Sequence, residues 1–312
     1  MTKQHRSGFV AMVGRPNAGK STLTNALVGE KVAITSSKPQ TTRHAIRGIV
    51  TRPDFQMILV DTPGIHRPRT LLGQRLNDLV EETLADVDVI CFCLPADQKV
   101  GPGDRFIAAA LAELQKLRRA PAVIAIVTKT DLVGHEQLMN HLIAVDQLLN
   151  FKEIIPLSAV TGKQVETLLE VVTRYLPASP PLYPEETVTD ETDTKRIAEL
   201  IREAALEGVR DELPHSLAVV VEEIVEQSLD GDPFAEVAPG EGKLVVRATI
   251  YVERPSQKGI IIGRAGSRLK EVGTTARQGI QKLLGRRLYL DLRVKVAKDW
   301  QRDPKQLQRL GF

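Results

Sequence analysis

Residues Gly14 to Ser21 read GRPNAGKS, which matches the glycine-rich pattern G-x-x-x-x-G-K-S in full. The octet follows a short apolar run, residues 8–14, and opens a stretch with helical spacing, residues 21–29, that closes on a glycine. In that setting backbone amides wrap phosphates, Lys20 reaches the β- and γ-phosphates, and Ser21 holds magnesium. We therefore expect this loop to bind a nucleotide through Gly14, Arg15, Pro16, Asn17, Ala18, Gly19, Lys20, Ser21 and Thr22.

Strand-like and helix-like runs alternate after the octet. Strands are expected at residues 44–52, 55–61, 86–94, 121–129 and 153–159, and helices at residues 71–85, 104–117 and 165–176. Cys91 and Cys93 share one face of their strand, as suits the packing of a buried sheet. This alternation predicts an α/β domain, residues 1–177, with a mostly parallel sheet and ligands at the carboxyl ends of the strands.

The composition then changes. Residues 177–193 are rich in proline and acidic residues, and we interpret residues 178–193 as a linker. Beyond it the pattern predicts a smaller α+β domain, residues 194–312. Its elements are a helix at residues 194–212, strands at 217–226 and 243–253, a short helix, a helix at 267–285, and a strand at 288–296. The stretch at residues 229–242 is expected to be a loop.

Charge divides the chain unevenly. Residues 241–312 hold 17 basic and 6 acidic residues, a charge of +11, whereas the first 240 residues carry −8. Such an excess favours a polyanionic partner, the alternative being a solvated basic face. No apolar run is long enough to span a membrane, the first eight residues lack an apolar signal core, and the two cysteines imply no disulfide scaffold. These observations fit a cytoplasmic protein.

Two further stretches suit a magnesium and γ-phosphate sensor. Asp61 closes an apolar strand, where a carboxylate can meet magnesium, and Gly64 can offer its amide to the γ-phosphate. The polar loop at residues 36–44 supplies a threonine for the magnesium shell, and we favour Thr42 over Thr41. Thr62 and Pro63 complete the predicted contact. Ile65, next in the chain, has no donor or acceptor with which to orient water.

The tetrad TKTD, residues 128–131, predicts guanine as the base. The Asp131 carboxylate can accept hydrogen bonds from guanine, whereas adenine offers it a lone pair at the corresponding ring nitrogen. Lys129 can lie along the base, and the stretch that contains Ser158 and Ala159 can bring an amide to the guanine oxygen. Thr128 opens the tetrad, and its hydroxyl can brace the phosphate loop.

The stretch KGIIIGRAGSRLK, residues 258–270, holds a G-x-x-G tetrapeptide between two helices, as in the phosphate-contacting clamp of KH domains, and a purely structural turn is the alternative. The strand and helix order matches a type II KH domain. Trp300, the only tryptophan, suits either stacking on a base or anchoring the last helix. We expect RNA contacts from Lys258, Ile261, Gly263, Arg264, Ala265, Gly266, Arg268 and Lys270.

Taken in order, GRPNAGKST, TTRH, DTPGIH, TKTD and LSA resemble the Era family of GTPases, and the resemblance extends through the KH region. It implies a GTPase with Mg²⁺ held by Ser21, Thr42 and Asp61, and with Lys20, Asn17, Thr42 and Gly64 acting in hydrolysis. In that family the fourth motif usually begins with asparagine, so Thr128 departs from it, and we expect guanine selectivity to survive with some loss of affinity. It also implies binding to 16S ribosomal RNA near its 3′ end and a role in 30S assembly. GTPases resembling this one can hold K⁺ through the residue corresponding to Asn17. Loose membrane association is a further implication, and we expect a monomer.

Two other functions remain open from the residues alone. One is a constitutive RNA-binding protein whose nucleotide domain is structural. The other is a P-loop ATPase or kinase, against which Asp131 stands together with the absence of an arginine-rich lid in the sequence. Phosphate release from GTP and ATP, with and without RNA, separates these functions.

Overall fold

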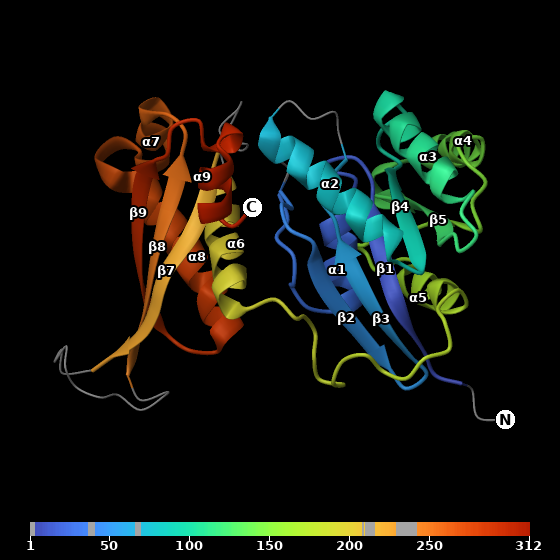
Figure 1. Ribbon diagram of the computed structural model, residues 1–312, viewed down its shortest axis with the longest axis horizontal. Coiled ribbons are helices and arrows are strands. Elements are labelled where there is room, and N and C mark those ends of the chain that lie inside the picture. The colour runs from blue at the N-terminus through green and yellow to red at the C-terminus, as the bar shows by residue number, and fades with distance from the viewer. Residues whose placement is uncertain (1–3, 37–40, 66–69, 208, 210–215, 229–241) are drawn as a thin grey trace. The chain divides into compact units, whose positions relative to one another are not determined.

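The computed structural model describes residues 4–36, 41–65, 70–207, 209, 216–228 and 242–312. Parts of the predicted loop 36–44 and helix 194–212, and nearly all of the loop 229–242, lie outside these residues. Two compact units are present (Figure 1). The first comprises Met1–Arg69 and Gly73–Asp190, and the second includes Glu191–Phe312.

A six-stranded sheet forms the centre of the first unit, in the order β2-β3-β1-β4-β5-β6. Strand β2 runs antiparallel to β3 at one edge, and the other described strands of this sheet run parallel to their neighbours. The apolar runs of the sequence therefore become a mostly parallel sheet, as predicted. The strands are β1 (Arg6–Val13), β2 (Ile46–Arg52), β3 (Phe55–Asp61), β4 (Val89–Pro95), β5 (Ala122–Thr128) and β6 (Ile154–Pro156).

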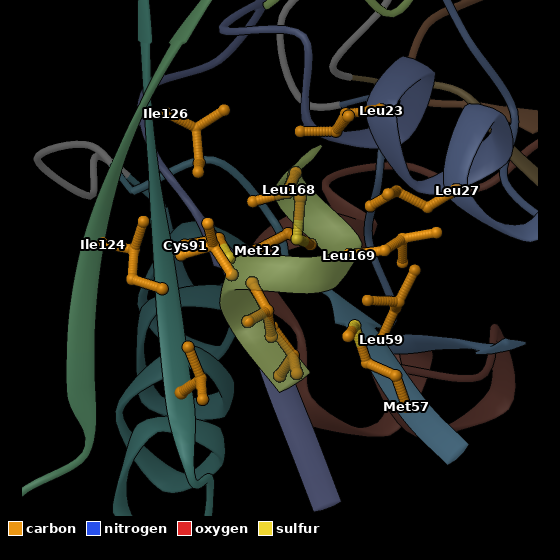
Figure 2. Close-up of a cluster of buried hydrophobic side chains, with 14 of the residues drawn as sticks. Met12, Leu23, Leu27, Met57, Leu59, Cys91, Ile124, Ile126, Leu168 and Leu169 are labelled. Carbon is orange, nitrogen blue, oxygen red and sulfur yellow. The ribbon is translucent and has the colours of Figure 1, made fainter. Parts of the chain in front are cut away.

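Helices cover both faces of this sheet (Figure 1). One face packs against α1 (Lys20–Val28) and α5 (Val165–Thr173), and the other against α2 (Leu71–Ala85), α3 (Pro102–Leu114) and α4 (His135–Asp146). Figure 2 shows the first of these two cores, where Cys91 lies among Met12, Leu168 and Leu169. Both cysteines are buried there, which confirms that they are packing residues. Because both faces are covered, the strands read as continuous apolar runs.

Residues 178–193 were predicted to be a linker, but most of them, through Asp190, belong to the first unit. We call residues 182–190 the edge strap, since they run along β2 at the edge of the sheet. The Ile49 amide donates to Val188 O at 2.9 Å, and Thr189 Oγ1 donates to Arg47 O at 2.7 Å. The edge strand β2 has backbone donors and acceptors on its outer side, and the edge strap pairs with them. The proline-rich composition of the segment gives no sign of this pairing.

The second unit has the order α6 (Asp193–Leu206), β7 (Ala218–Gln227), β8 (Lys243–Val252), α7 (Pro255–Ile262), α8 (Ser267–Leu284) and β9 (Leu288–Val296). Strand β8 is central, antiparallel to β7 and parallel to β9. One face of this sheet packs on the three helices around Ile201, Ile250 and Ile280, which are each fully buried. The order of elements is that of the predicted KH domain. A 3₁₀ turn, η3 (Trp300–Arg302), and a short helix, α9 (Pro304–Arg309), follow.

Helix α6 ends six residues before the predicted end at Glu212. Glu207 has extended backbone (φ −60°, ψ 133°), and a glycine follows it in the sequence. The guanidinium of Arg268 donates to Ala205 O and Glu207 O, so a side chain from α8 satisfies carbonyls that the helix end leaves open. Apolar spacing continues past Leu206, which is why the sequence alone overestimates the length of this helix.

No helix in the part of the chain that the structure describes is long and apolar enough to cross a membrane.

Candidate functional site

The phosphate loop connects β1 to α1 and carries Lys20 at the first position of the helix. The Lys20 side chain lies almost wholly buried, with Nζ 3.0 Å from both Gly14 O and Arg15 O. Burial lowers the pKa of Lys20, and the charges of Asp61 and Cys93 act in the opposite direction. Two loop carbonyls thus hold the ammonium inside the curve of the loop, at the amino end of α1 where phosphates bind.

The three predicted magnesium ligands come together from three segments. Thr42 Oγ1 lies 2.9 Å from Ser21 Oγ and donates to Asp61 Oδ2 at 3.4 Å. Asp61 is fully buried, and its Oδ1 has no hydrogen-bond partner among the described residues. Burial raises the pKa of Asp61 to about 6, opposed by Ser21, Lys20 and Thr42. Two hydroxyls beside a carboxylate with an unused oxygen form a donor set that fits a hard cation such as Mg²⁺.

Gly64 brings the segment after β3 against the phosphate loop. A Cβ atom at Gly64 would lie 2.6 Å from Pro16 N, so only glycine permits this approach. The Ile65 amide donates to Gly14 O at 3.3 Å, and the Ile65 side chain packs against the core on the α2, α3 and α4 face. Thr62 Oγ1 donates to Met12 O at 2.7 Å. The segment predicted to sense the γ-phosphate therefore lies against the phosphate loop, and Ile65 contributes packing and no water-orienting group.

The base-recognition segments meet where β5 and β6 end. Thr128 Oγ1 donates to Ala18 O at 2.7 Å, so the unusual threonine does brace the phosphate loop. Lys129 has a left-handed backbone (φ 58°), and its Nζ lies 3.2 Å from Asp97 Oδ2, while Asp131 is exposed. The Ser158 amide donates to Lys163 O at 3.1 Å. That bond leaves the neighbouring amide of Ala159 as the one we expect to meet the guanine oxygen.

Replacing Thr128 with valine should weaken nucleotide binding. The change removes the hydroxyl that satisfies Ala18 O inside the buried loop, and an unsatisfied buried acceptor costs about 1 to 3 kcal/mol. We expect the affinity for GDP, measured by titration calorimetry, to fall about tenfold, while Thr128→Ser keeps it. An unchanged affinity in the valine variant would contradict the bracing role.

The G-x-x-G clamp joins α7 to α8. Gly263 (φ 73°) passes so close to α8 that an added Cβ would lie 2.7 Å from the Cβ of Arg268. Ala265 and Gly266 are also left-handed, at φ 50° and 78°. This backbone exposes the side chains of Arg264 and Ala265 at the start of α8, where helix-end amides and charge can meet a phosphodiester.

The structure corrects the predicted RNA contacts of Ile261 and Arg268 and decides between the two roles proposed for Trp300. Ile261 is fully buried in the core of the second unit, so it offers no surface to a base, whereas its neighbour Ile260 is 53% exposed. The guanidinium of Arg268 is taken up by the end of α6, and Arg268 is therefore a structural residue. Lys258 is half-buried and Lys270 exposed. Trp300 is fully buried, donates to Ser216 O at 3.0 Å and stacks on Phe312, so it anchors the end of the chain.

Sequence reasoning missed two acidic partners of the site. Asp97 pairs with Lys129, and Asp104 pairs with Arg15 at 2.6 Å. The sequence held a signal for the first pair, because parallel β4 and β5 end side by side with Pro95 opposite Thr128. Asp97 comes two residues after Pro95, and Lys129 comes one residue after Thr128. Nothing in the sequence connects Arg15 with Asp104, which are 89 residues apart.

This fold and these sites define a P-loop GTPase joined to a KH domain. Residues 9–129 match the family described as "50S ribosome-binding GTPase", and residues 212–301 match the KH domain family. The chain is 61% identical to GTPase Era of Streptomyces coelicolor over 99% of this chain and 95% of that protein. It is 60% identical to GTPase Era of Mycobacterium tuberculosis over the full length of both chains. The chain therefore belongs to the GTPase Era family, and it is a GTPase.

Solved structures agree over nearly the whole length. Era in complex with MgGDPNP and nucleotides 1506–1542 of 16S ribosomal RNA has a TM-score of 0.89 and 37% identity, over 98% of this chain and 99% of that one. A single-residue variant of Aquifex aeolicus Era bound to GDP and AlF₄⁻ has a TM-score of 0.88 and 35% identity, with the same coverage of both chains. The predicted fold class and family are thus confirmed.

Proposed function

We propose that this GTPase binds 16S ribosomal RNA near its 3′ end in a GTP-dependent manner and assists assembly of the 30S subunit. One observation carries the proposal, the likeness of the whole chain to an Era structure that holds both MgGDPNP and a 16S ribosomal RNA fragment. In this chain GTP would lie on the phosphate loop and Asp131. Mg²⁺ would lie between Ser21, Thr42 and Asp61, where Asp61 Oδ1 has no hydrogen-bond partner in the described part of the chain.

The clamp of the second unit supports the RNA half of the proposal. Arg264, Ala265 and Lys270 are exposed around the left-handed turn, and they lie in the part of the chain that carries +11. We propose that RNA contacts Lys258, Gly263, Arg264, Ala265, Gly266 and Lys270, with Ile260 taking the apolar role predicted for Ile261. Backbone phosphates then meet the clamp, and exposed bases meet Ile260.

The edge strap supports a connection between nucleotide state and RNA affinity. Strand β2 begins four residues after Thr42, and Arg47 on this strand forms a 2.9 Å ion pair with Asp190. Tyr183 also donates to Asp190, and the Gln56 side chain binds the Leu182 and Tyr183 amides at 2.6 and 2.8 Å. Helix α6 starts only three residues after Asp190. A change at Thr42 on binding GTP and Mg²⁺ would therefore reach β2 within four residues, and the hydrogen bonds of β2 to the edge strap connect it to the segment that leads into α6.

The test is to compare RNA affinity between nucleotide states. The full-length protein would be titrated with a 16S fragment covering the 3′ end, in the presence of Mg²⁺ and either a non-hydrolysable GTP analogue or GDP. We expect at least tenfold tighter binding with the analogue, since a ligand shifts an equilibrium only by its differential affinity. Equal affinities and rates in the two states would favour the constitutive RNA-binding protein instead.

We also propose that K⁺ assists hydrolysis through Asn17. Ile65 offers no water-orienting group, so charge developing on the phosphates needs another partner, and Asn17 (φ 62°) sits in the phosphate loop. We expect turnover of GTP to be about tenfold faster in K⁺ than in Na⁺, below the ~10³ to 10⁵ effect of an arginine finger. Asn17→Ala should remove the difference between the two salts. Identical rates in both salts for the unaltered protein would contradict the proposal.

We propose further that the protein acts as a monomer in the cytoplasm. The association with the membrane that the family resemblance implies would then be peripheral, because the described helices include no membrane span. Flotation of the protein with vesicles that contain anionic lipids tests this membrane association. Protein that stays at the bottom of the gradient, while the vesicles float, would exclude it.

A further inference from the structure

A buried ion pair ties the phosphate loop to helix α3. Arg15 Nε donates to Asp104 Oδ1 at 2.6 Å, and the Asp104 side chain is fully buried while that of Arg15 is 25% exposed. The second carboxylate oxygen, Oδ2, accepts from the Gly101 amide at 2.8 Å. Both oxygens of Asp104 are therefore engaged, which fixes the carboxylate and, with it, the direction of the Arg15 side chain.

The start of α3 is also shaped around Arg15. A Cβ atom at Gly103 would lie 2.7 Å from Arg15 Cδ, so the first turn of the helix approaches the arginine stem closely, and a larger residue there would displace that stem. The stem is thus confined by Gly103 while its head group is held by Asp104. Gly103 and Asp104, which are consecutive in α3, therefore both contact the Arg15 side chain of the phosphate loop.

The backbone of Arg15 leads directly to the reacting groups. Its carbonyl oxygen accepts from Lys20 Nζ at 3.0 Å and from the Ala18 amide at 3.3 Å. The next residue, Pro16, is the one against which Gly64 packs. A shift of Arg15 would therefore move a carbonyl that holds Lys20 and the surface on which the γ-phosphate sensor rests.

We propose that Asp104 is a positioning residue for GTP hydrolysis. It holds Arg15, and through the Arg15 backbone it keeps the phosphate loop in the geometry from which Lys20 meets the phosphates. Asp104 acts through Arg15 and not on the nucleotide. This role concerns turnover of GTP and is independent of the proposed RNA binding, so the two can fail separately.

The first test is Asp104→Asn in the full-length protein. The asparagine oxygen can still accept from Gly101, but the charge that holds Arg15 is lost. We expect kcat/KM for GTP, measured with Mg²⁺ and without RNA, to fall about tenfold, since small misplacements in a site are costly. The control is Glu113→Gln on the same helix, whose ion pair with Lys116 is 2.7 Å long but about 70% exposed on both sides. The control should leave kcat/KM unchanged.

A second variant separates positioning from folding. Arg15→Gln combined with Asp104→Asn leaves no buried charge without its partner, so it avoids the penalty of a half-broken pair. The single variant, Asp104→Asn, and the double variant are both assayed well below their melting temperatures. If Asp104 positions the loop, kcat/KM stays about tenfold low in both, whatever the melting temperatures are. Turnover that follows the melting temperature, or kcat/KM equal to that of the unaltered protein in either variant, overturns the proposal.

Discussion

Replacing Asp61 with asparagine is expected to lower magnesium-dependent turnover of GTP strongly and, at the same time, to stabilise the nucleotide-free protein. The carboxylate lies between Ser21 and Thr42 in the donor set that fits Mg²⁺. Asp61 would be the anionic ligand of a bound Mg²⁺ in this set, and the asparagine variant would lack that charge. The Lewis-acid assistance that a bound Mg²⁺ supplies is worth several kcal/mol. We expect GTP turnover to fall about 100-fold or more.

The gain in stability follows from the burial of Asp61. Its folded-state pKa, about 6, is raised above the ordinary value of 3.8, so the ionised form is disfavoured in the fold. Stability contributed by the protonated form is therefore present below pH 4 and is lost as pH rises through 6. A rise of about 2 units corresponds to roughly 3 kcal/mol at pH 7, of which Asp61→Asn should recover about 1 to 3 kcal/mol.

Calorimetric unfolding in EDTA between pH 4 and pH 7.5 measures this effect. The unaltered protein should lose stability relative to Asp61→Asn as pH rises from 4 to 6.5, and the difference should then level off. Asp86→Asn is the control, because Asp86 is exposed just after α2 and its removal should change neither turnover nor this pH dependence. A variant less stable than the unaltered protein at pH 7 would show that Asp61 supports the empty fold.

Local pattern was enough to predict which residues come together at the candidate nucleotide site. The phosphate loop is a strand, a turn and a helix in uninterrupted order, so its geometry follows from neighbouring residues. Asp61 and Thr128 end buried parallel strands, and such ends meet at one edge of a sheet. The place of Asp61 beside the phosphate loop and the Thr128 bond to Ala18 follow from that rule, whereas Thr42 lies before the antiparallel strand β2, to which the rule does not apply.

Features that depend on the direction of side chains could not be predicted in this way. Ile260, Ile261 and Ile262 are identical in type, and the phase of α7, set by packing in the second unit, decides that Ile261 is buried and Ile260 exposed. The charge of Arg268 predicts a contact with RNA, but its guanidinium donates a hydrogen bond to Ala205 O at the end of α6. These outcomes rest on contacts between distant parts of the chain.

Placing two aspartates in the clamp, as Arg264→Asp with Ala265→Asp, is expected to remove most of the RNA affinity. Both side chains are exposed, and the left-handed backbone of Ala265 (φ 50°) suits aspartate at least as well as alanine. The fold should therefore survive, with a melting temperature within a few degrees of the unaltered protein. Repulsion of phosphates and loss of the arginine should lower affinity for the 16S fragment about 100-fold at physiological salt.

The matched control makes the same charge changes elsewhere on α8. Arg277→Asp with Gln278→Asp also alters two exposed residues, away from the clamp, and should weaken binding far less because only long-range attraction is lost. Arg268→Ala gives the converse result, a lower melting temperature through the uncapped end of α6. If the clamp and control variants lost equal affinity, the basic charge of the unit, and not the clamp, would bind the RNA. A clamp variant that bound as the unaltered protein does would place the RNA on another surface altogether.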